Sequence, residues 1–244
     1  MLRRCPAGWS QKRSARRCWS RWSSGPGSAA ALSPSDTGLQ LLENSTATVF
    51  GLAVLILVFG PISGAHFNPV VSAVDWLLTR RTGDGLTGRE VLAYAAAQIV
   101  GGVAGAVLAN IMFDLAPVQV STKDRLSAGH GVGEVVATAG LVLLIFALAR
   151  TGRAVLSAAA VGAYIGSAYW FTSSTSFANP AVTVGRMFSD TFAGIATSSA
   201  PVFIAAQLVG GLLGLGLVRY LFPDAAASAA QAVVPHPTRT TKRG

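Results

Sequence analysis

Long apolar runs separated by short polar segments make up most of this chain. A transmembrane helix needs about 20 consecutive, mostly apolar residues. Five segments reach that length, at residues 41–62, 89–113, 132–150, 154–172 and 200–222. Two shorter apolar stretches, residues 68–79 and 179–189, each begin with Asn-Pro and are too short to span. The pattern predicts an all-α membrane protein with five transmembrane helices and two re-entrant half-helices.

The chain also repeats itself. AAQIVGGVAGAVL at residues 96–108 matches AAQLVGGLLGLGL at 205–217, and FNPVV at 67–71 matches ANPAV at 178–182. The two offsets, 109 and 111 residues, nearly agree, and such repeats are typical of membrane channels and transporters. The second repeat holds three spans, an odd number, so the two repeats must have opposite orientations in the membrane. The first repeat lacks one span, which belongs near residues 9–28.

Residues 9–24, WSQKRSARRCWSRWSS, stand where that span is expected, with three Trp and five basic residues but no apolar run. Trp has one codon, TGG, and most Ser codons are TCN. In the frame that joins the last base of one codon to the next two bases, each Trp-Ser pair gives the Val codon GTC. The whole segment then reads approximately LVAEAVGTAVLVAVVVGSGI, a transmembrane helix with an acidic residue near its start. We interpret residues 1–31 as an out-of-frame first helix; a genuine disordered basic leader is the alternative.

Charge and composition narrow the function classes. Only 12% of residues are charged, although the net charge is +9. The basic residues lie in the N-terminal segment, the short loops and the tail, which suits membrane topology better than nucleic-acid binding. With six spans, the basic loops and the tail share one side, the cytoplasm. Neither the two Cys nor the three separated His indicate a disulfide framework or a metal site, and no set of residues indicates an enzyme.

The two Asn-Pro pairs suggest a pore. Asn is a preferred N-cap and Pro a preferred first helical residue, so Asn68-Pro69 and Asn179-Pro180 each start a helix. Inverted repeats point both N-termini at the membrane midplane, where their helix dipoles oppose cations and protons. The Asn amides can donate hydrogen bonds to a neutral solute. Irregular backbone before each pair fits the lining of a water-filled cavity.

These residues resemble those of the aquaporin (major intrinsic protein) family. The resemblance rests on SGAHFNPV (63–70), ANPA (178–181), the repeated AAQ-VGG and Glu134, and it covers about residues 36–222. It implies an aquaporin-like inverted repeat with six spans in the intact fold, one pore per subunit, and homotetramers in the plasma membrane. The implied organisation is an aberrant segment (1–31), a channel domain (32–222, with repeats to about 115 and from about 128) and a cytoplasmic tail (223–244). No cofactor is implied.

The resemblance also assigns site residues. The pore motifs are Asn68-Pro69-Val70 and Asn179-Pro180-Ala181. Counting by the family's spacing places the selectivity filter at Thr48, Ser167, Ser176 and Val182. Val182 stands where the family usually has Arg, so the filter is expected to be small, uncharged, hydroxyl-lined and wide. That favours neutral solutes such as glycerol, urea or undissociated metalloid acids such as arsenite, with ions and protons excluded.

Three ionisable residues have two interpretations each. In the family, the residue like Glu134 accepts backbone N–H bonds from a re-entrant loop, which we favour over a proton relay. His66 is a loop-packing residue or a gate. Arg186 either replaces the missing Arg or, as we expect, pairs with Asp190 four residues on.

The leading interpretation is therefore a passive channel for water and small neutral solutes. An ion-coupled transporter is a second class, and Glu134 is its one candidate proton site within a span. A non-functional truncated homologue is the third.

Overall fold

The computed structural model describes residues 36–83 and 85–223, and the regular elements of that part are helices. In chain order they are α2 (Thr37–Ser63), α3 (Pro69–Thr79), α4 (Gly88–Met112), α5 (Ala128–Arg150), the 3-10 turn η2 (Ala154–Leu156), α6 (Ser157–Phe171), α7 (Pro180–Arg186) and α8 (Ala200–Leu221). The segment interpreted as an out-of-frame helix lies outside the described residues.

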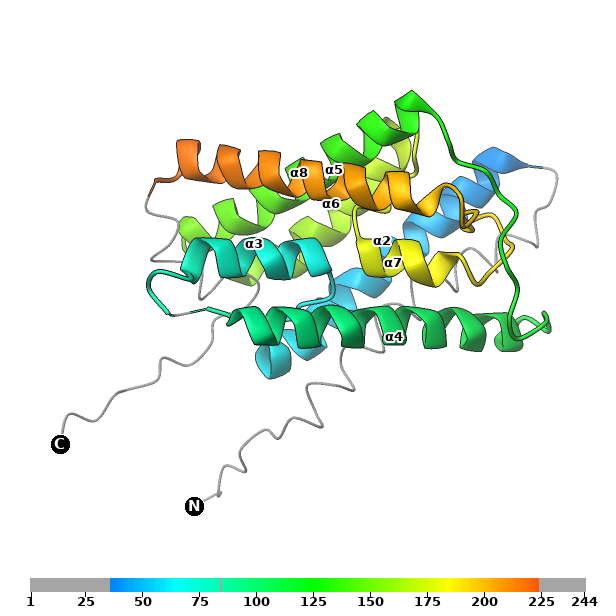
Figure 1. Cartoon of the computed structure of the whole chain (residues 1–244), viewed down its shortest axis with the longest axis horizontal. Helices are drawn as coiled ribbons and strands as arrows, with labels where there is room; N and C mark the ends of the chain where they lie inside the picture. Colours follow the sequence, from blue (N-terminus) through cyan, green and yellow to red (C-terminus); the bar gives the residue numbers. More distant parts are fainter. Residues whose placement is uncertain (1–35, 84, 224–244) are drawn as a thin grey trace, which may run out of the picture.

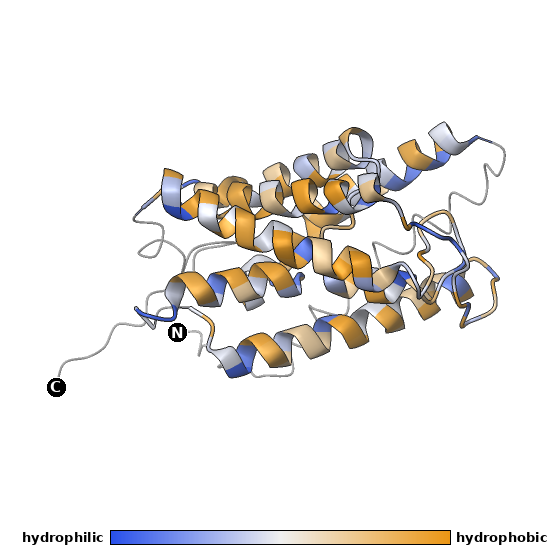
Figure 2. Cartoon of the chain, turned by 45° about the horizontal axis from the view of Figure 1, so that its top comes forward, coloured by the Kyte–Doolittle hydropathy of each residue, from blue (hydrophilic) through white to orange (hydrophobic). Residues whose placement is uncertain are grey.

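Five of the helical segments are long and apolar enough to cross a membrane: α2, α4, α5, η2 with α6, and α8. They match the five predicted spans with ends that differ by a few residues. Their surfaces are largely apolar, and the hydrophilic residues gather at helix ends and in connections (Figure 2). Lipid offers no partners to backbone polar groups, and continuous helices satisfy those groups internally. The prediction of a multi-pass membrane protein is confirmed.

The two short helices, α3 and α7, lie nearly end to end between α4 and α8, with their N-termini facing each other near the centre (Figure 1). Each begins at the predicted Asn-Pro pair. α7 ends at Arg186, three residues before the predicted end. We name the two ends of the molecule the α3 side and the α7 side, after the half-helix that points toward each.

Close helix pairing depends on glycines. α5 packs against α8, α2 against α6, and α4 against α7. A Cβ on Gly214 of α8 would come within 2.8 Å of the Ala139 carbonyl oxygen on α5, and one on Gly162 of α6 within 2.7 Å of the Val49 carbonyl oxygen on α2. A Cβ on Gly185 of α7 would likewise lie 2.8 Å from the Gly102 carbonyl oxygen on α4. Small residues at such contacts let membrane helices approach backbone to backbone.

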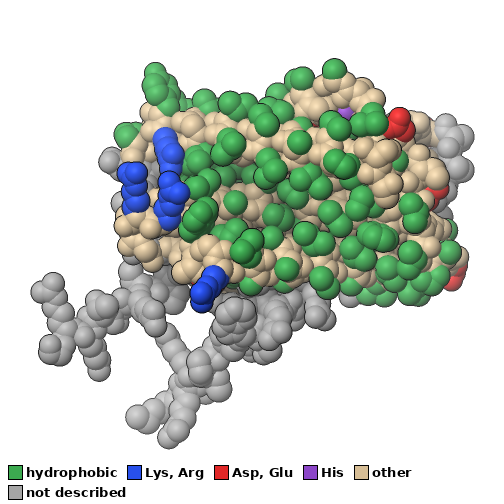
Figure 3. Space-filling view, in the orientation of Figure 1, with side chains coloured by type: hydrophobic (Ala, Val, Ile, Leu, Met, Phe, Trp, Pro, Cys, Tyr) green, Lys and Arg blue, Asp and Glu red, His purple; other side chains and the backbone are tan. Residues whose placement is uncertain are grey.

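Charged side chains separate between the two ends of the molecule. On the visible face, Lys and Arg gather at the α3 side, Asp and Glu appear at the α7 side, and apolar side chains cover the surface between them (Figure 3). The polar ends and apolar middle fit a body that spans a bilayer.

We expect Gly214→Ala to destabilise the protein by about 1–3 kcal/mol, because the added methyl overpacks the α5–α8 contact. Gly216 of the same helix is the matched control, since a Cβ there meets nothing within 4 Å in the structure. Gly216→Ala should be neutral or slightly stabilising. Thermal unfolding in detergent measures both; equal melting temperatures for the two variants would contradict the proposed basis of helix packing.

Candidate functional site

The side chain of each pore-motif Asn caps its own half-helix and also binds the opposite loop. Asn68 Oδ1 accepts the Val70 N–H at 3.0 Å, and Asn179 Oδ1 accepts the Ala181 N–H at 3.0 Å, so each caps its own half-helix. The amide nitrogens then cross to the opposite loop. Asn68 Nδ2 donates to the Ala178 carbonyl at 2.7 Å, and Asn179 Nδ2 donates to the Phe67 carbonyl at 3.0 Å. The two half-helices are therefore tied together at their N-termini.

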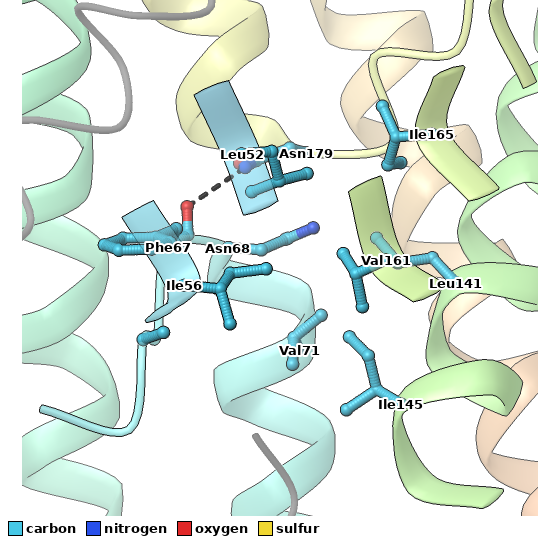
Figure 4. A pocket seen from close by; sticks show the side chains of 11 residues that line it. Leu52, Ile56, Phe67, Asn68, Val71, Leu141, Ile145, Val161, Ile165 and Asn179 are labelled. Carbon is cyan, nitrogen blue, oxygen red and sulfur yellow. Dashed lines mark hydrogen bonds between the residues drawn. The ribbon is translucent and has the colours of Figure 1, made fainter. Parts of the chain in front are cut away.

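A cavity of about 50 Å³ adjoins this junction, enough for a few water molecules. Figure 4 shows Asn68 and Asn179 among apolar side chains from α2, α3, α5 and α6. The NH₂ group of each Asn side chain has two hydrogens, and one of them is donated to the opposite loop. One hydrogen per Asn therefore remains to donate to a solute. The cavity is thus lined by Asn68, Asn179, Leu52, Ile56, Ala65, Phe67, Val71, Leu141, Ile145, Val161 and Ile165.

The third residues of the two motifs, Val70 and Ala181, are apolar and contribute packing contacts. Ala181 is fully buried, and Val70 is 3% exposed. Val70 lies against α8, where a Cβ on Gly211 would be 2.4 Å from Val70 Cγ1. Because Gly211 has no side chain, α8 has room for Val in place of Ala. The first motif therefore departs from the family pattern without disturbing the Asn junction.

Glu134 is completely buried on α5 and binds the loop that precedes α7. Its carboxylate accepts the Phe177 and Ala178 N–H groups, each at 2.8 Å. It also accepts the Ser174 hydroxyl at 2.7 Å and the Gln207 amide at 2.6 Å. Four donors around one carboxylate satisfy both oxygens, which is the loop-holding geometry that the sequence analysis favoured.

Two glutamines from the repeated AAQ segments form matching networks. Gln207 Nε2 also donates to Thr183 Oγ1 at 2.9 Å, and Thr183 donates on to the Asn179 carbonyl. In the other repeat, Gln98 Nε2 donates to the His66 carbonyl at 2.7 Å and lies 3.4 Å from Ser72 Oγ. Ser72 donates on to the Asn68 carbonyl. The role of this Gln was not predicted from the sequence, although a polar residue at the same place in both copies of the repeat was the available signal.

The loop before α7 has a strained backbone. Thr175, Ser176 and Ala178 have positive φ angles of 61°, 48° and 47°, which non-glycine residues seldom adopt. Each such residue costs of order 1–3 kcal/mol and persists where surrounding contacts over-determine it. Glu134 supplies part of those contacts by accepting hydrogen bonds from N–H groups of the loop.

Arg125, from the α4–α5 connection, supplies contacts to carbonyl groups. Its guanidinium donates to the carbonyls of Ser174, Phe192 and Gly194 at 2.8–3.3 Å, and it is 5% exposed. Burial, with the nearby Arg186 as a smaller cause, lowers the pKa of Arg125 to about 10. No pattern in the sequence distinguished this Arg from other loop charges.

His66 is buried beside Asn68 and packs against other side chains. Its Nδ1 lies 3.3 Å from Ser72 Oγ, and its ring meets the Tyr94 ring edge to face at 5.4 Å. These contacts favour the loop-packing interpretation of His66.

The four predicted filter residues differ in burial. Thr48 and Val182 are buried, and Ser176 is 2% exposed with no hydrogen-bond partner for its Oγ among the described residues. Ser167 is exposed and donates to the Ala163 carbonyl of its own helix, and its placement in the filter stays a prediction. The residue on α6 that reaches Thr48 is Tyr169, whose hydroxyl lies 3.2 Å from Thr48 Oγ1.

The expected pairing of Arg186 with Asp190 is replaced by other contacts. Arg186 is 2% exposed; its Nη2 donates to the Tyr169 hydroxyl at 2.7 Å, and its guanidinium lies 4.3 Å from the Phe177 ring centroid. Asp190 instead accepts hydrogen bonds from Thr122 and Ser121 of the α4–α5 connection.

Comparisons with known proteins agree with this geometry. Residues 23–176 match the family model described as major intrinsic protein. The chain is 45% identical to aquaglyceroporin AqpS of Rhizobium meliloti (strain 1021) over 201 residues, which covers 82% of this chain and 84% of that protein. It is 29% identical to the probable aquaporin AqpM of Archaeoglobus fulgidus, covering 70% and 74% of the two chains. The aquaglyceroporin structure from Plasmodium falciparum superposes with a TM-score of 0.63 at 17% identity, covering 90% of this chain and all of that one.

We expect Glu134→Gln to destabilise the protein by about 3 kcal/mol or more. The Gln amide has one acceptor oxygen in place of two, and hydrogen bonds to charged groups contribute about 1.5–3 kcal/mol each. Glu90→Gln is the control, since the Glu90 side chain closes a capping box that Gln can also form. Thermal unfolding compares them. A Glu134→Gln variant as stable as Glu90→Gln would contradict the loop-holding role.

The pH dependence of stability should include a contribution from Lys123. Burial, then Arg125 and Arg186, lowers the pKa of Lys123 from 10.5 to about 8. Between these values the unfolded state binds more protons, so this group makes stability rise with pH there and has a constant penalty below about 8. Lys123→Met should therefore stabilise the protein most at pH 7, with a gain that shrinks toward pH 10. A gain that did not change with pH would contradict the lowered pKa.

Proposed function

The chain belongs to the major intrinsic protein family and is a passive channel for water and small neutral solutes such as glycerol, and from this premise we infer that it favours neutral solutes larger than water. Glycerol, urea and undissociated metalloid acids such as arsenite are the proposed class. Ions and protons are excluded.

The observation behind the proposal is the Asn junction at the two half-helix N-termini. Each N-terminus carries roughly half a positive charge from its helix dipole, and the two meet beside one cavity. A cation or a proton entering there meets both dipoles without a carboxylate among the residues that line the cavity. A neutral solute meets a spare amide hydrogen on each Asn. The junction therefore supports passage of hydrogen-bonding solutes that carry no charge.

We propose a wide pore because Val182 stands where the family usually has Arg. Val182 packs in the same apolar cluster as Leu52 and Ile165, which line the cavity. It adds neither charge nor donors at that level. The name of the relative AqpS, an aquaglyceroporin, is consistent with a pore for solutes such as glycerol.

A proton-coupled transporter would need an exchangeable ionisable group on the solute path. Glu134 is the candidate, yet its two oxygens already accept four hydrogen bonds. Protonation of either oxygen would place a hydrogen where that oxygen now accepts a loop N–H group. These contacts support a passive channel over coupled transport.

The setting of the channel is also proposed. The basic residues at the α3 side favour a cytoplasmic location for that end, by the positive-inside rule. The C-terminal tail follows α8, which ends on that side (Figure 1), and is placed in the cytoplasm. We place the protein in the plasma membrane as a homotetramer.

The full chain in proteoliposomes tests the proposal. Stopped-flow light scattering should report glycerol flux above that of empty liposomes, with no proton leak by a pH-sensitive dye. Asn179→Asp removes the donor to Phe67 and adds a negative charge at the dipoles. Glycerol flux should then fall roughly tenfold, the equivalent of about 1.4 kcal/mol, and proton leak should rise.

Gln119→Glu is the matched control, because it makes the same amide-to-carboxylate change in the α4–α5 connection, where Gln119 Oε1 accepts the Asp190 N–H. It should keep wild-type flux. Absence of glycerol flux in the wild-type chain would contradict the proposed function and favour the interpretation as a non-functional homologue.

A further inference from the structure

An open groove lies on the outer surface of the protein, where α5, α6 and α8 meet. Its volume is about 630 Å³, and it shares no lining residue with the cavity beside the Asn junction. Tyr164 of α6 lines it together with Val136 and Gly140 of α5 and Leu213 and Gly216 of α8. The three helices, with η2 extending α6, are long and apolar enough to span a membrane, so the groove opens to lipid rather than to water.

The groove has one polar side chain, and the hydrogen of that side chain is already donated. The Tyr164 hydroxyl donates to the Ala137 carbonyl of α5 at 3.0 Å. Gly140 leaves space for this hydroxyl, because a Cβ at that position would overlap the Tyr164 oxygen. The other side chains that line the groove are apolar. A ligand of this groove is therefore a hydrocarbon group that needs no hydrogen bonds.

The exposed rim of the groove favours a lipid chain over a second membrane helix. Leu212, Leu213 and Val136 are 61%, 53% and 49% exposed. Membrane helices associate through small residues that let backbones approach, and through polar side chains that form hydrogen bonds across the contact. The branched rim residues hold a second backbone away, and the Tyr164 hydrogen is already used. A slender acyl chain fits between the rims beside Gly216, where a Cβ would meet nothing within 4 Å.

The end of the groove toward the α3 side carries positive charge. Leu156 and Arg153 precede Tyr164 by eight and eleven residues, about two and three helical turns, which places them on or near the same face. Both are exposed. On α8, which ends on the α3 side (Figure 1), Tyr220 follows Gly216 by four residues and is 83% exposed. Tyr is enriched at the level of the lipid headgroups, so this end of the groove meets the membrane interface.

The charge of the headgroup, and not the apolar lining, should decide which lipid occupies the groove. A lipid tail is as apolar as the groove, so a chain that moves into it from the bilayer gains no hydrophobic free energy. Basic residues near the membrane surface attract anionic headgroups. On the visible face, Lys and Arg gather at the α3 side and acidic residues appear at the α7 side (Figure 3). A negative headgroup is therefore favoured at the α3 end.

We propose that this groove binds one acyl chain of an anionic phospholipid from the leaflet on the α3 side, with the lipid headgroup beside Arg153. The chain covers the exposed rim residues and contacts α5, α6 and α8 together. The proposal requires that the protein spans a membrane, and it does not depend on which solute the pore conducts.

Native mass spectrometry of the full chain tests the headgroup preference. The protein is mixed in detergent with equal amounts of phosphatidylglycerol and phosphatidylcholine, and the lipids retained by each protomer are counted. The wild type should retain phosphatidylglycerol over phosphatidylcholine by roughly fivefold, the preference that one basic residue near the surface provides. Arg153→Gln should remove this preference. Arg89→Gln should keep it, because Arg89 lies in the first turn of α4, which packs against α3 and α7.

The same spectra test the groove itself. Gly216→Leu places a side chain in the groove and should remove most of the retained lipid of both kinds. Gly131→Leu is the matched control, since a Cβ on Gly131 also meets nothing within 4 Å and Gly131 does not line the groove. Equal lipid retention by the two Leu variants, or equal retention of the two lipids by the wild type, would overturn the proposal.

A second copy of the chain is the competing occupant of the groove. In that case Gly216→Leu would lower the fraction of oligomer relative to Gly131→Leu and leave lipid retention unchanged, a result that also contradicts the proposal. Melting temperatures in detergent show whether each variant is folded. Because Arg153 is exposed, Arg153→Gln decides the headgroup preference even if Gly216→Leu fails to fold.

Discussion

The buried carboxylate of Glu134 is the interaction on which the rest of the site depends. A membrane interior supplies no water to the N–H groups of a non-helical loop, so those groups need partners inside the protein. Glu134 provides acceptors for Phe177 and Ala178 at 2.8 Å each, and Ala178 offers its own carbonyl to Asn68. The strained loop, the helix start at Asn179 and the junction between half-helices therefore follow from one side chain, with Arg125 binding the loop carbonyls.

The two repeats solve the same problem with shared and unshared parts. Each uses an Asn cap, a hydroxyl four residues later and a Gln from the AAQ segment, as in Asn179, Thr183 and Gln207. In the described residues the carboxylate appears in the second repeat. Its counterpart in the first repeat is the acidic residue expected from the out-of-frame interpretation of residues 1–31, which lie outside the described range. The fold near Asn68 is consistent with either origin of that segment.

Much of the fold was predictable because the membrane imposes a simple rule. Apolar length marks spans, and two Asn-Pro pairs in an inverted repeat mark half-helices that meet. The contacts of individual side chains were harder to predict, because no such rule applies to them. Ser167 and Tyr169 differ by two residues, about 200° around a helix, and α6 is too apolar on all sides for periodicity to choose between them. Arg186 was expected to pair locally with Asp190, but Tyr169 and Phe177, distant in sequence, offered it buried contacts instead.

Two half-helices meet through crossed Asn contacts, next to a loop that Glu134 binds. An experimental structure of the full chain in lipid nanodiscs, with side chains visible at the midplane, tests it most directly. We predict that Asn68 Nδ2 donates to the Ala178 carbonyl and that Asn179 Nδ2 donates to the Phe67 carbonyl. The Glu134 carboxylate should accept the Phe177 and Ala178 N–H groups. Half-helix N-termini held apart, or a Glu134 carboxylate turned away from the loop, would contradict it.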